Sequence, residues 1–497
     1  MTYSFLREKV MRTIKFWTME QSILMKRKLF KDLQDTNNKK INEAIFLTGM
    51  TACEIAKGLN IEIEDESVIT NISTDSREID DNTIFVAIKG ERFDGHRFVS
   101  SALEKGAKYA VVSEICEDAP REKQLLVRDT KQAMIDIASV YRDKFDVNIV
   151  AVTGSVGKTT TKEMIHCVLS SKYNTLKTEG NFNNEIGMPK TIFNLTEEHQ
   201  MAVIEMGMCA LKEIEALSLS AKPQIGVITS IGVSHIEKLG SRNNILRAKM
   251  EIIAGMEKGS PLVLCGDNDL LQQVSCDDHP IYTYGIDNMK STVYAEHITQ
   301  IEGSTFFKII YAGEEYNAKI PAIGKHNVLN ALCAFIIGLL CDITPDEIIK
   351  SLGEYKPSGM RQNIVEFKGL TIIEDCYNAS PDSMRAAIKT YAAMNCSRNK
   401  YLILSDMLEL GERSEMEHIG VGEFAKVGGE FIILATGEMG EGYVKGYNTD
   451  EKAHYFETKE ELFDYIKQNV YKGDALWFKA SRGAKLEEII QRIYKEC

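Results

Sequence analysis

Residues 147–169 constrain the fold more than any other stretch, because they predict a strand, a glycine-containing turn and a helix in that order. Gly154 and Gly157 allow the backbone N–H groups of the turn to face an anion, and the helix N-terminus adds partial positive charge. The usual phosphate-loop pattern is not complete, because Val152 stands where the first glycine is expected. The alternative is a plain strand-to-helix turn. The Gly-Lys-Thr sequence at the end of the turn favours a phosphate loop.

The residue types in this turn suggest how a nucleotide would be held. Lys158 would reach the β- and γ-phosphates, and the Thr159 hydroxyl would ligate Mg²⁺, which prefers oxygen ligands. The predicted nucleotide-binding residues of the loop are Gly154, Ser155, Val156, Gly157, Lys158, Thr159 and Thr160.

Polar side chains follow further predicted strands in the same part of the chain. Glu205 comes directly after an apolar run, and His235 follows the next such run after a short loop. Ligands of open α/β sheets bind at the carboxyl ends of the strands, so both side chains could meet Mg²⁺ held by Thr159. A lone histidine at such a place can also be structural. Asn327 and Asn330 lie three apart on one face of a predicted helix, where they could contact a nucleotide base or cap the helix.

The flanking stretches also alternate between strands and helices. Residues 46–145 predict a small α/β domain, in which the Asp75-Ser76-Arg77 turn could hold a phosphate or be a solvated turn. Residues 357–497 alternate short apolar strands with helices, which predicts a parallel sheet. Gly359 marks a hinge before this last part.

Length, charge and cysteine usage exclude some classes of protein. A chain of 497 residues predicts about three domains. The net charge of −13 argues against nucleic-acid binding by bulk electrostatics. The 11 cysteines include no C-x-x-C pair, which indicates free thiols in a reducing compartment. No apolar run approaches the length of a membrane span, about 18 residues, so we expect no transmembrane segment and a cytoplasmic location.

Residues 1–45 stand apart because they are basic. A basic amphipathic helix there could lie on an anionic membrane surface. The simpler interpretations are an extension without a regular fold or a start codon assigned too early.

An ordered series of motifs over residues 46–497 resembles the Mur ligase family. The N-terminal part of the series is Thr74–Arg77, Phe85–Gly90 and Asp94–His96. The central part is Gly154–Thr160, Asn181–Gly187, Glu205–Gly207, His235 and Ala248–Ile252. Asp375–Pro381 and Asp406–Gly411 are similar to signatures of the member that adds a dipeptide. Ser380 departs from the family, which usually has Asn there, and Ala480 stands in place of a usual Gly.

The resemblance implies an α/β fold of three domains after the extension 1–45. These are a UDP-muramoyl-peptide-binding domain over 46–145, a central P-loop ATP-binding domain with a mainly parallel sheet over 146–356, and a Rossmann-like ligase domain over 357–497. It implies an ATP- and Mg²⁺-dependent ligase of peptidoglycan synthesis that joins D-Ala-D-Ala to UDP-N-acetylmuramoyl-tripeptide through an acyl phosphate. The alternatives are a sibling ligase that adds a single amino acid and a non-catalytic paralogue that binds the precursor. A generic P-loop kinase or transport ATPase would explain neither flanking domain.

The resemblance also implies the roles of individual residues. Thr159, Glu205 and His235 would hold metal together with Lys249, which would be carbamylated. Lys158 would offset phosphate charge, Asn327 and Asn330 would face adenine, and Arg361 would bring positive charge to the γ-phosphate. The substrate-binding residues would be Ser76, Arg77, Asn183, Asn184, Asp375, Asn378, Ser380, Lys479 and Arg482. We expect the protein to act as a cytoplasmic monomer.

Overall fold

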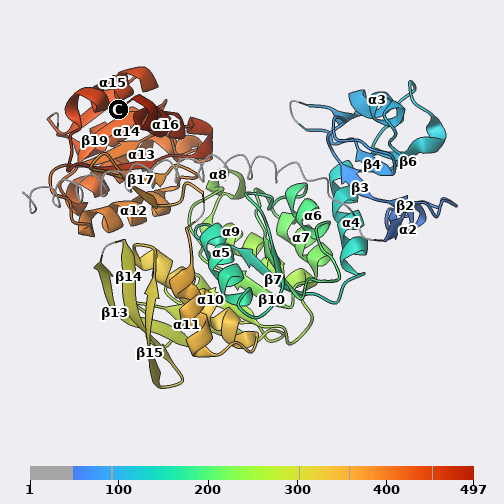
Figure 1. Ribbon diagram of the computed structural model, residues 1–497, viewed down its shortest axis with the longest axis horizontal. Helices are drawn as coiled ribbons and strands as arrows, with labels where there is room; N and C mark the ends of the chain where they lie inside the picture. Colours follow the sequence, from blue (N-terminus) through green and yellow to red (C-terminus); the bar gives the residue numbers. More distant parts are fainter. Residues whose placement is uncertain are drawn as a thin grey trace, which may run out of the picture. The chain divides into compact units, whose positions relative to one another are not determined.

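The computed structural model (Figure 1) describes residues 47, 49–90, 93–301, 303–357, 359–449 and 451–496. The basic stretch 1–45, with its three interpretations, lies outside the described residues. The described chain forms two compact units. Unit 1 holds residues 66–126 with the few described residues before Ala52, and unit 2 holds residues 52–65 and everything from Val127 onward. The three predicted domain boundaries remain predictions.

Unit 1 is built around a parallel sheet of four strands in the order β3-β4-β5-β6. The bounds of its elements are β1 (Met50–Thr51), β2 (Val68–Ile69), β3 (Asn71–Ser73), β4 (Thr83–Val86), η1 (Gly95–Phe98), α3 (Val99–Glu104), β5 (Tyr109–Val112), η2 (Arg121–Lys123) and β6 (Gln124–Leu126). The apolar side chains of β4, β5 and α3 form one buried core, in which Phe85 and Val99 take part. The predicted small α/β fold is therefore confirmed for this stretch.

The first sheet of unit 2 has nine strands. In spatial order they are β15 (Glu314–Ile320), β14 (Ser304–Tyr311), β13 (Val293–Ile301), β12 (Ile281–Gly285), β11 (Leu262–Cys265), β10 (Ile225–Ile228), β7 (Asn148–Thr153), β9 (Met201–Glu205) and β8 (Thr175–Lys177). The pairs from β13 to β8 are parallel, as predicted. The antiparallel extension β13–β15, drawn in yellow in Figure 1, was not predicted from the sequence.

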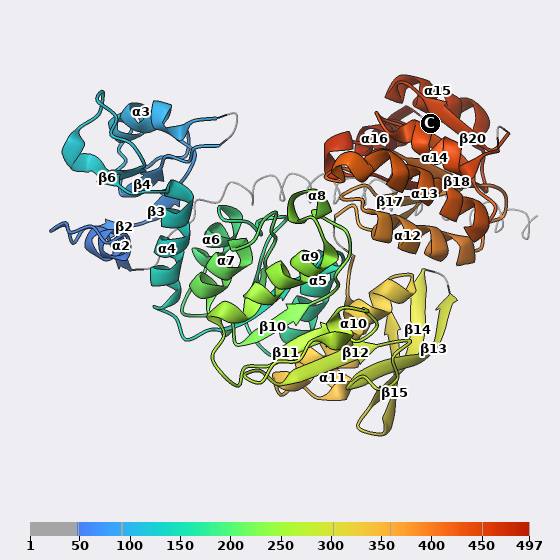
Figure 2. The same ribbon diagram turned by 180° about the vertical axis from the view of Figure 1, so that it is seen from behind.

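Helices pack in two groups around this sheet. The first group is α5 (Lys158–Leu169), α10 (Lys325–Leu340) and α11 (Pro345–Glu354), and Figures 1 and 2 show α5 beside α10. The second group is α2 (Ala52–Gly58), α4 (Thr130–Arg142), α6 (Gly187–Ile192), α7 (Glu213–Ala221), α8 (Ile236–Leu239) and α9 (Arg242–Met250), followed by η3 (Glu251–Gly255) and η4 (Leu271–Gln273). Strand β7 is buried from its second residue onward, as a parallel strand covered on both faces should be.

The second sheet of unit 2 has six strands. In spatial order they are β16 (Asn363–Phe367), β17 (Leu370–Asp375), β21 (Ala475–Lys479), β18 (Lys400–Leu404), β19 (Ile432–Thr436) and β20 (Ala453–Phe456). All pairs are parallel except β16 with β17. One apolar core joins the sheet to α12 (Pro381–Ala393), α13 (Ser414–Gly428) and α14 (Gly440–Tyr447), and a second joins it to α15 (Lys459–Asn469) and α16 (Glu487–Glu496). Two cores on one parallel sheet confirm the predicted Rossmann-like architecture.

Strand register brings the predicted residues together at the carboxyl ends of both sheets. In the first sheet β7 lies between β9 and β10, with Val152 beside Glu205. In the second sheet Asp375 is paired in register with Lys479 on the neighbouring strand. Within the described residues, every helix is too short or too polar to cross a bilayer. The ten described cysteines are all free.

Candidate functional site

The phosphate loop turns directly after β7, and its two glycines are required by the space around them. Gly154 and Gly157 have φ of 149° and 90°, which favour glycine. A Cβ on Gly154 would lie 1.9 Å from the Thr229 hydroxyl oxygen, and one on Gly157 would lie 3.0 Å from Asn330 Oδ1. Val152, where the usual pattern has a glycine, is a buried residue of β7 paired on both sides. The turn therefore begins after Val152, which explains the incomplete motif.

Lys158 is the first residue of α5, and its side chain folds back over the loop. Its Nζ donates a hydrogen bond to the Gly154 carbonyl oxygen at 2.8 Å. Burial lowers the pKa of the Lys158 ammonium, while the nearby Glu205 carboxylate raises it and Arg361 lowers it further. The half-buried Lys158 thus lies over the loop, and the charge of Arg361 acts on its ammonium.

Thr159 and Glu205 form an oxygen-rich group beside the loop. The Thr159 hydroxyl donates to Glu205 Oε2 at 2.8 Å, and Asn183 Nδ2 donates to Glu205 Oε1 at 2.8 Å. Glu205 is buried, and its backbone N–H donates to the Thr178 hydroxyl at 2.9 Å. A hydroxyl and a carboxylate at this spacing are ligand types that suit Mg²⁺. The residues present therefore fit the metal that the sequence predicts here.

His235 follows β10, the strand that neighbours β7, as predicted from the sequence. It has a φ of 63° and lies immediately before α8. Its Nδ1 lies 2.8 Å from Glu409 Oε2, which comes from the loop after β18 and also has a left-handed φ, 65°. This contact lowers the pKa of the Glu409 carboxyl. In this structure the predicted metal ligand His235 thus has a carboxylate partner from the second sheet's side.

Lys249 lies on α9, is buried, and is absent from the lining of the cavity described below. Burial, followed by the charge of Lys158, holds the pKa of the Lys249 ammonium well below its usual range. A neutral amine is the form that reacts with CO₂, so this environment suits the predicted carbamate. The carbamate itself remains a prediction.

Asn327 and Asn330 belong to a hydrogen-bonded chain between helices. Asn330 Oδ1 accepts a bond from the Thr161 hydroxyl on α5 at 3.0 Å. Asn330 Nδ2 donates to Asn327 Oδ1 at 3.2 Å, and Asn327 Nδ2 donates to Ile323 O and Gln362 Oε1. Neither side chain caps α10, whose N-cap is Gly324. Both asparagines line the cavity, so contact with a nucleotide base remains the prediction for them.

The second sheet contributes a buried ion pair to the other side of the cavity. Lys479 Nζ lies 2.8 Å from Asp375 Oδ2 and also donates to the Asn378 carbonyl oxygen at 3.3 Å. Trp477 Nε1 donates to the same carboxylate oxygen at 3.3 Å. The two charged side chains are therefore bonded to each other in addition to facing the cavity.

Three further predicted substrate residues also have partners within the protein. Asn378 Oδ1 accepts from the Ala379 N–H at 2.9 Å. Ser380 is the N-cap of α12, where its side chain accepts a hydrogen bond from the Ser383 N–H. Arg482 forms an ion pair with Glu487 at 2.9 Å. The Ser that replaces the family's usual Asn at position 380 thus serves as a good helix cap.

One cavity of about 920 Å³ brings most of these residues together. Its lining includes the predicted residues Ser155, Val156, Gly157, Lys158, Thr159, Thr160, Asn183, Asn184, Glu205, His235, Asn327, Asn330, Arg361, Asp375, Asn378, Ser380, Lys479 and Arg482. Gly154 and Lys249 are not in the lining. Ser230 and Gln362 line the cavity but were not singled out from the sequence. Tyr377 and Glu409 also line it; they belong to the Asp375–Pro381 and Asp406–Gly411 motifs, although neither was assigned a role of its own. Ser230, whose hydroxyl accepts from the Val156 N–H at 2.9 Å, could have been found because it follows β10 as His235 does.

Ser76 and Arg77 lie in unit 1 and are described there alone. The Arg77 guanidinium is held by Asp75, with Nε 2.9 Å from Oδ1 and Nη2 2.6 Å from Oδ2. The Ser76 carbonyl oxygen accepts from Lys105 Nζ at 2.8 Å. The turn is thus an ordered, exposed arginine–carboxylate pair, and its phosphate contact remains a prediction.

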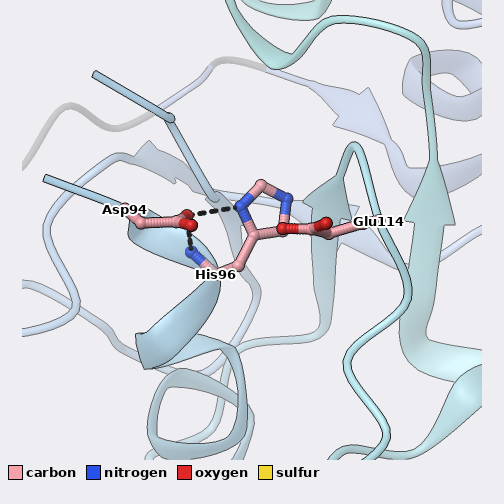
Figure 3. Close-up of side chains that lie close together, drawn as sticks. All are labelled: Asp94, His96 and Glu114. Carbon is pink, nitrogen blue, oxygen red and sulfur yellow. Dashed lines mark hydrogen bonds and ion pairs between the residues drawn. The ribbon is translucent and has the colours of Figure 1, made fainter. Parts of the chain in front are cut away.

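Unit 1 also contains Asp94, His96 and Glu114, whose possible ligand atoms lie within 4.8 Å of one another (Figure 3). The geometry argues against a metal here. His96 Nε2 accepts from the Ser113 N–H at 2.9 Å, and His96 Nδ1 lies 2.8 Å from Asp94 Oδ1. Because Nε2 accepts a bond, Nδ1 carries the proton and donates it, so the ring has no lone pair left for an ion. Asp94 and His96 instead connect η1 to Ser113, the residue that follows β5.

The fold and the cavity define a phosphate-loop nucleotide-binding protein in which a Rossmann-like part supplies the opposite side of the site. Family models match three stretches of the chain: "Mur ligase family, catalytic domain" over residues 68–142, "Mur ligase middle domain" over 152–338, and "Mur ligase, glutamate ligase domain" over 360–482. The UDP-N-acetylmuramoyl-tripeptide–D-alanyl-D-alanine ligase of Bacillus subtilis is 41% identical over 434 residues, which cover 86% of this chain and 93% of that protein. The chain therefore belongs to the Mur ligase family, as the sequence motifs indicated.

Further relatives agree over nearly the whole length. The ligase of the same description from Escherichia coli is 31% identical over 90% of this chain and 99% of its own. Among solved structures, MurF from Acinetobacter baumannii has a TM-score of 0.83 at 29% identity and covers 90% of this chain and 100% of its own. MurF from Thermotoga maritima in complex with ADP has a TM-score of 0.78 at 28% identity and covers 86% of this chain and 97% of its own.

Proposed function

We propose that this protein is an ATP-dependent amide ligase that joins D-Ala-D-Ala to UDP-N-acetylmuramoyl-tripeptide and so completes the pentapeptide precursor of peptidoglycan. The observation that carries the proposal is the cavity itself. It combines a phosphate loop with the Asp375–Pro381 and Asp406–Gly411 loops, and relatives that match at this length bear the name of that ligase.

The chemistry follows from the poor reactivity of a carboxylate. The terminal carboxylate oxygen of the tripeptide attacks the γ-phosphorus of ATP, ADP leaves, and an acyl phosphate forms. The amine nitrogen of the dipeptide then attacks the acyl carbon, loses a proton, and phosphate leaves with its bonding electrons. We propose that Lys158 offsets negative charge on the β- and γ-phosphates and that Arg361, which lines the same cavity, adds a second positive charge there.

Thr159 and Glu205 would hold Mg²⁺, with His235 and a carbamylated Lys249 as the further ligands that we propose. When bound, the metal supplies Lewis-acid stabilisation of phosphate charge. Because His235 contacts Glu409 through Nδ1, its Nε2 is the nitrogen that would ligate the metal, with Glu409 orienting the ring. The buried Glu205, held by Asn183 and by the Thr178 hydroxyl, is fixed in place by the chain itself.

The remaining parts would bind the two peptide substrates. We propose that residues 46–145 bind the UDP end of the acceptor, with Ser76 and Arg77 at its phosphates. The loops beginning at Asp375 and Lys479 would contact the dipeptide. Both sides of the cavity of unit 2 come from one chain, so we propose that the protein acts as a monomer. We also propose a cytoplasmic location, because the described cysteines are free and the substrate is a nucleotide.

Release of phosphate tests this proposal most simply. Purified protein is incubated with ATP, Mg²⁺ and UDP-N-acetylmuramoyl-tripeptide, and the amine is varied across D-Ala-D-Ala, other dipeptides and single amino acids. We expect turnover to need both the acceptor and a dipeptide, because a site built for two residues leaves polar groups unpaired when one is missing, at about 1–3 kcal/mol per buried group. Equal turnover with single amino acids would move the protein to a sibling activity. Binding of the precursor without any turnover would make it a non-catalytic paralogue.

A further inference from the structure

We infer that Gln362 is a positioning residue: its side chain fastens Arg361 beside the phosphate loop by receiving hydrogen bonds from the start of α10. This inference rests on the proposed function for the role of Arg361 at the γ-phosphate. The residues that carry it are Gln362, its two partners on α10, and Arg361 itself.

The side-chain oxygen of Gln362 accepts two hydrogen bonds from one helix. Asn327 Nδ2 and His326 Nε2 each lie 3.0 Å from Gln362 Oε1. An amide oxygen can only accept a hydrogen bond, so His326 Nε2 carries the proton that is donated. Burial also lowers the pKa of His326. Both partners lie in the first turn of α10, so the contact joins this helix to the residue that precedes β16.

The contact continues to the helix that ends the phosphate loop. Asn327 Oδ1 accepts from Asn330 Nδ2 at 3.2 Å, and Asn330 Oδ1 accepts from the Thr161 hydroxyl at 3.0 Å. Thr161 is fully buried on α5, three residues after Lys158. A continuous chain of side-chain hydrogen bonds therefore leads from α5 through α10 to Gln362.

The backbone of Gln362 also needs these bonds. Its φ is 55°, in the left-handed region that side chains other than Asn, Asp and Gly seldom adopt. Such a conformation persists where surrounding contacts hold it. The two hydrogen bonds to the Gln362 side chain are contacts of that kind. By holding the backbone at Gln362, they fix the direction in which the side chain of the preceding residue points.

That preceding residue is Arg361. Its guanidinium lies 4.0 Å from the centre of the Tyr377 ring, so it is held on one side by an aromatic face. Arg361 and Lys158 line the same cavity, and the charge of Arg361 acts on the Lys158 ammonium. Two like charges approach only where the fold holds them, and an incoming γ-phosphate would relieve that repulsion. Gln362 and Tyr377 together thus set where the second positive charge stands.

The test compares two nucleotides that differ in the γ-phosphate, so it needs no acceptor substrate. Affinities for ADP and for the β,γ-imido analogue of ATP, each with Mg²⁺, are measured by calorimetry for wild type, Gln362→Met, Arg361→Ala and the double variant. Methionine keeps the length of the side chain and removes the acceptor oxygen. We expect Gln362→Met to weaken the triphosphate analogue roughly tenfold and to leave ADP unchanged, because one charge-assisted contact is lost. In the Arg361→Ala background the same substitution should have no further effect.

Two additional variants separate positioning from a general structural role. Gln362→Glu keeps an acceptor oxygen and should retain the preference for the triphosphate. Met360→Leu changes the other neighbour of Arg361 without touching the contact and should behave as wild type. The inference is overturned if Gln362→Met leaves the preference intact, if it weakens both nucleotides equally, or if it has the same effect without Arg361. Because these are binding measurements, an inactive wild type would count against the ligase proposal and not against the role of Gln362.

Discussion

The two sides of the cavity differ in what their polar residues do for the fold. On the phosphate-loop side, Gly154 and Gly157 allow the backbone to turn close to Thr229 and Asn330, and Lys158 contacts only a backbone carbonyl among the hydrogen bonds described for it. On the Rossmann-like side, Asp375 and Lys479 form a buried ion pair between adjacent strands, and Ser380 caps a helix. We therefore expect the residues of the phosphate-loop side to act mainly in ligand binding. The residues of the Rossmann-like side also stabilise the fold of their domain.

Losses of activity in variants therefore have to be interpreted differently for the two sides of the cavity. A substitution on the phosphate-loop side should reduce turnover while the protein stays folded. A substitution on the other side should reduce stability, and any loss of turnover there will partly follow from unfolding. Rate and thermal unfolding therefore have to be measured together for every variant.

The largest effect is expected for Lys479→Met. It leaves the Asp375 carboxylate buried without its cation, which should lower the free energy of unfolding by about 3–5 kcal/mol. Denaturant unfolding followed by circular dichroism measures this change. The control is the double variant Asp375→Asn with Lys479→Met, which removes both charges and should recover much of the loss. A Lys479→Met protein as stable as wild type would end the distinction between the two sides.

The second largest effect is expected for Lys158→Ala, and it should be a loss of turnover. Loss of one electrostatic stabiliser should reduce kcat by at least ~10²-fold. Stability should not fall, because burial already lowers the pKa of this ammonium and so disfavours its charged form. Phosphate release and thermal unfolding of the same preparation give both numbers. Near-normal turnover would remove the loop from the mechanism.

Lys249→Ala should reduce turnover by about 10- to 100-fold if a carbamate at this position supports the metal site. Its buried surroundings favour the neutral amine from which a carbamate forms. Short-chain carboxylates added to the buffer should restore part of the activity by supplying the missing anion. Full activity of wild type after removal of CO₂, with an unmodified ammonium in a crystal structure, would exclude the carbamate.

The smallest effect is expected for Ser380→Ala, which should cost about 1 kcal/mol of stability through loss of the helix cap. Ser380→Asn restores both a capping side chain and the family's usual residue, so it serves as the matched control. If Ser380→Ala raised KM for the dipeptide while Tm stayed unchanged, Ser380 would act in substrate binding and not in stabilising the helix.

The sequence predicted the strands and the loop well because these depend on local patterns. Val152, Glu205 and His235 lie where their strand positions required, since β7, β9 and β10 are neighbours. What the sequence could not predict are contacts between distant segments. The pairing of His235 with Glu409, and of Asn327 with Gln362, joins residues that no periodicity connects. The antiparallel extension β13–β15 was also missed, because its alternating side chains resemble those of any half-buried strand.

Direct transfer of the γ-phosphoryl group to the acceptor carboxylate is the step on which the proposed reaction depends. It is tested by labelling both carboxyl oxygens of the tripeptide's terminal residue with oxygen-18 and analysing the released phosphate by mass spectrometry. Because the attacking carboxylate oxygen stays bonded to phosphorus when the amine displaces phosphate, each released phosphate should carry one labelled oxygen, and the new amide should keep the other. Unlabelled phosphate accompanying amide formation would contradict the acyl phosphate and the account built on it.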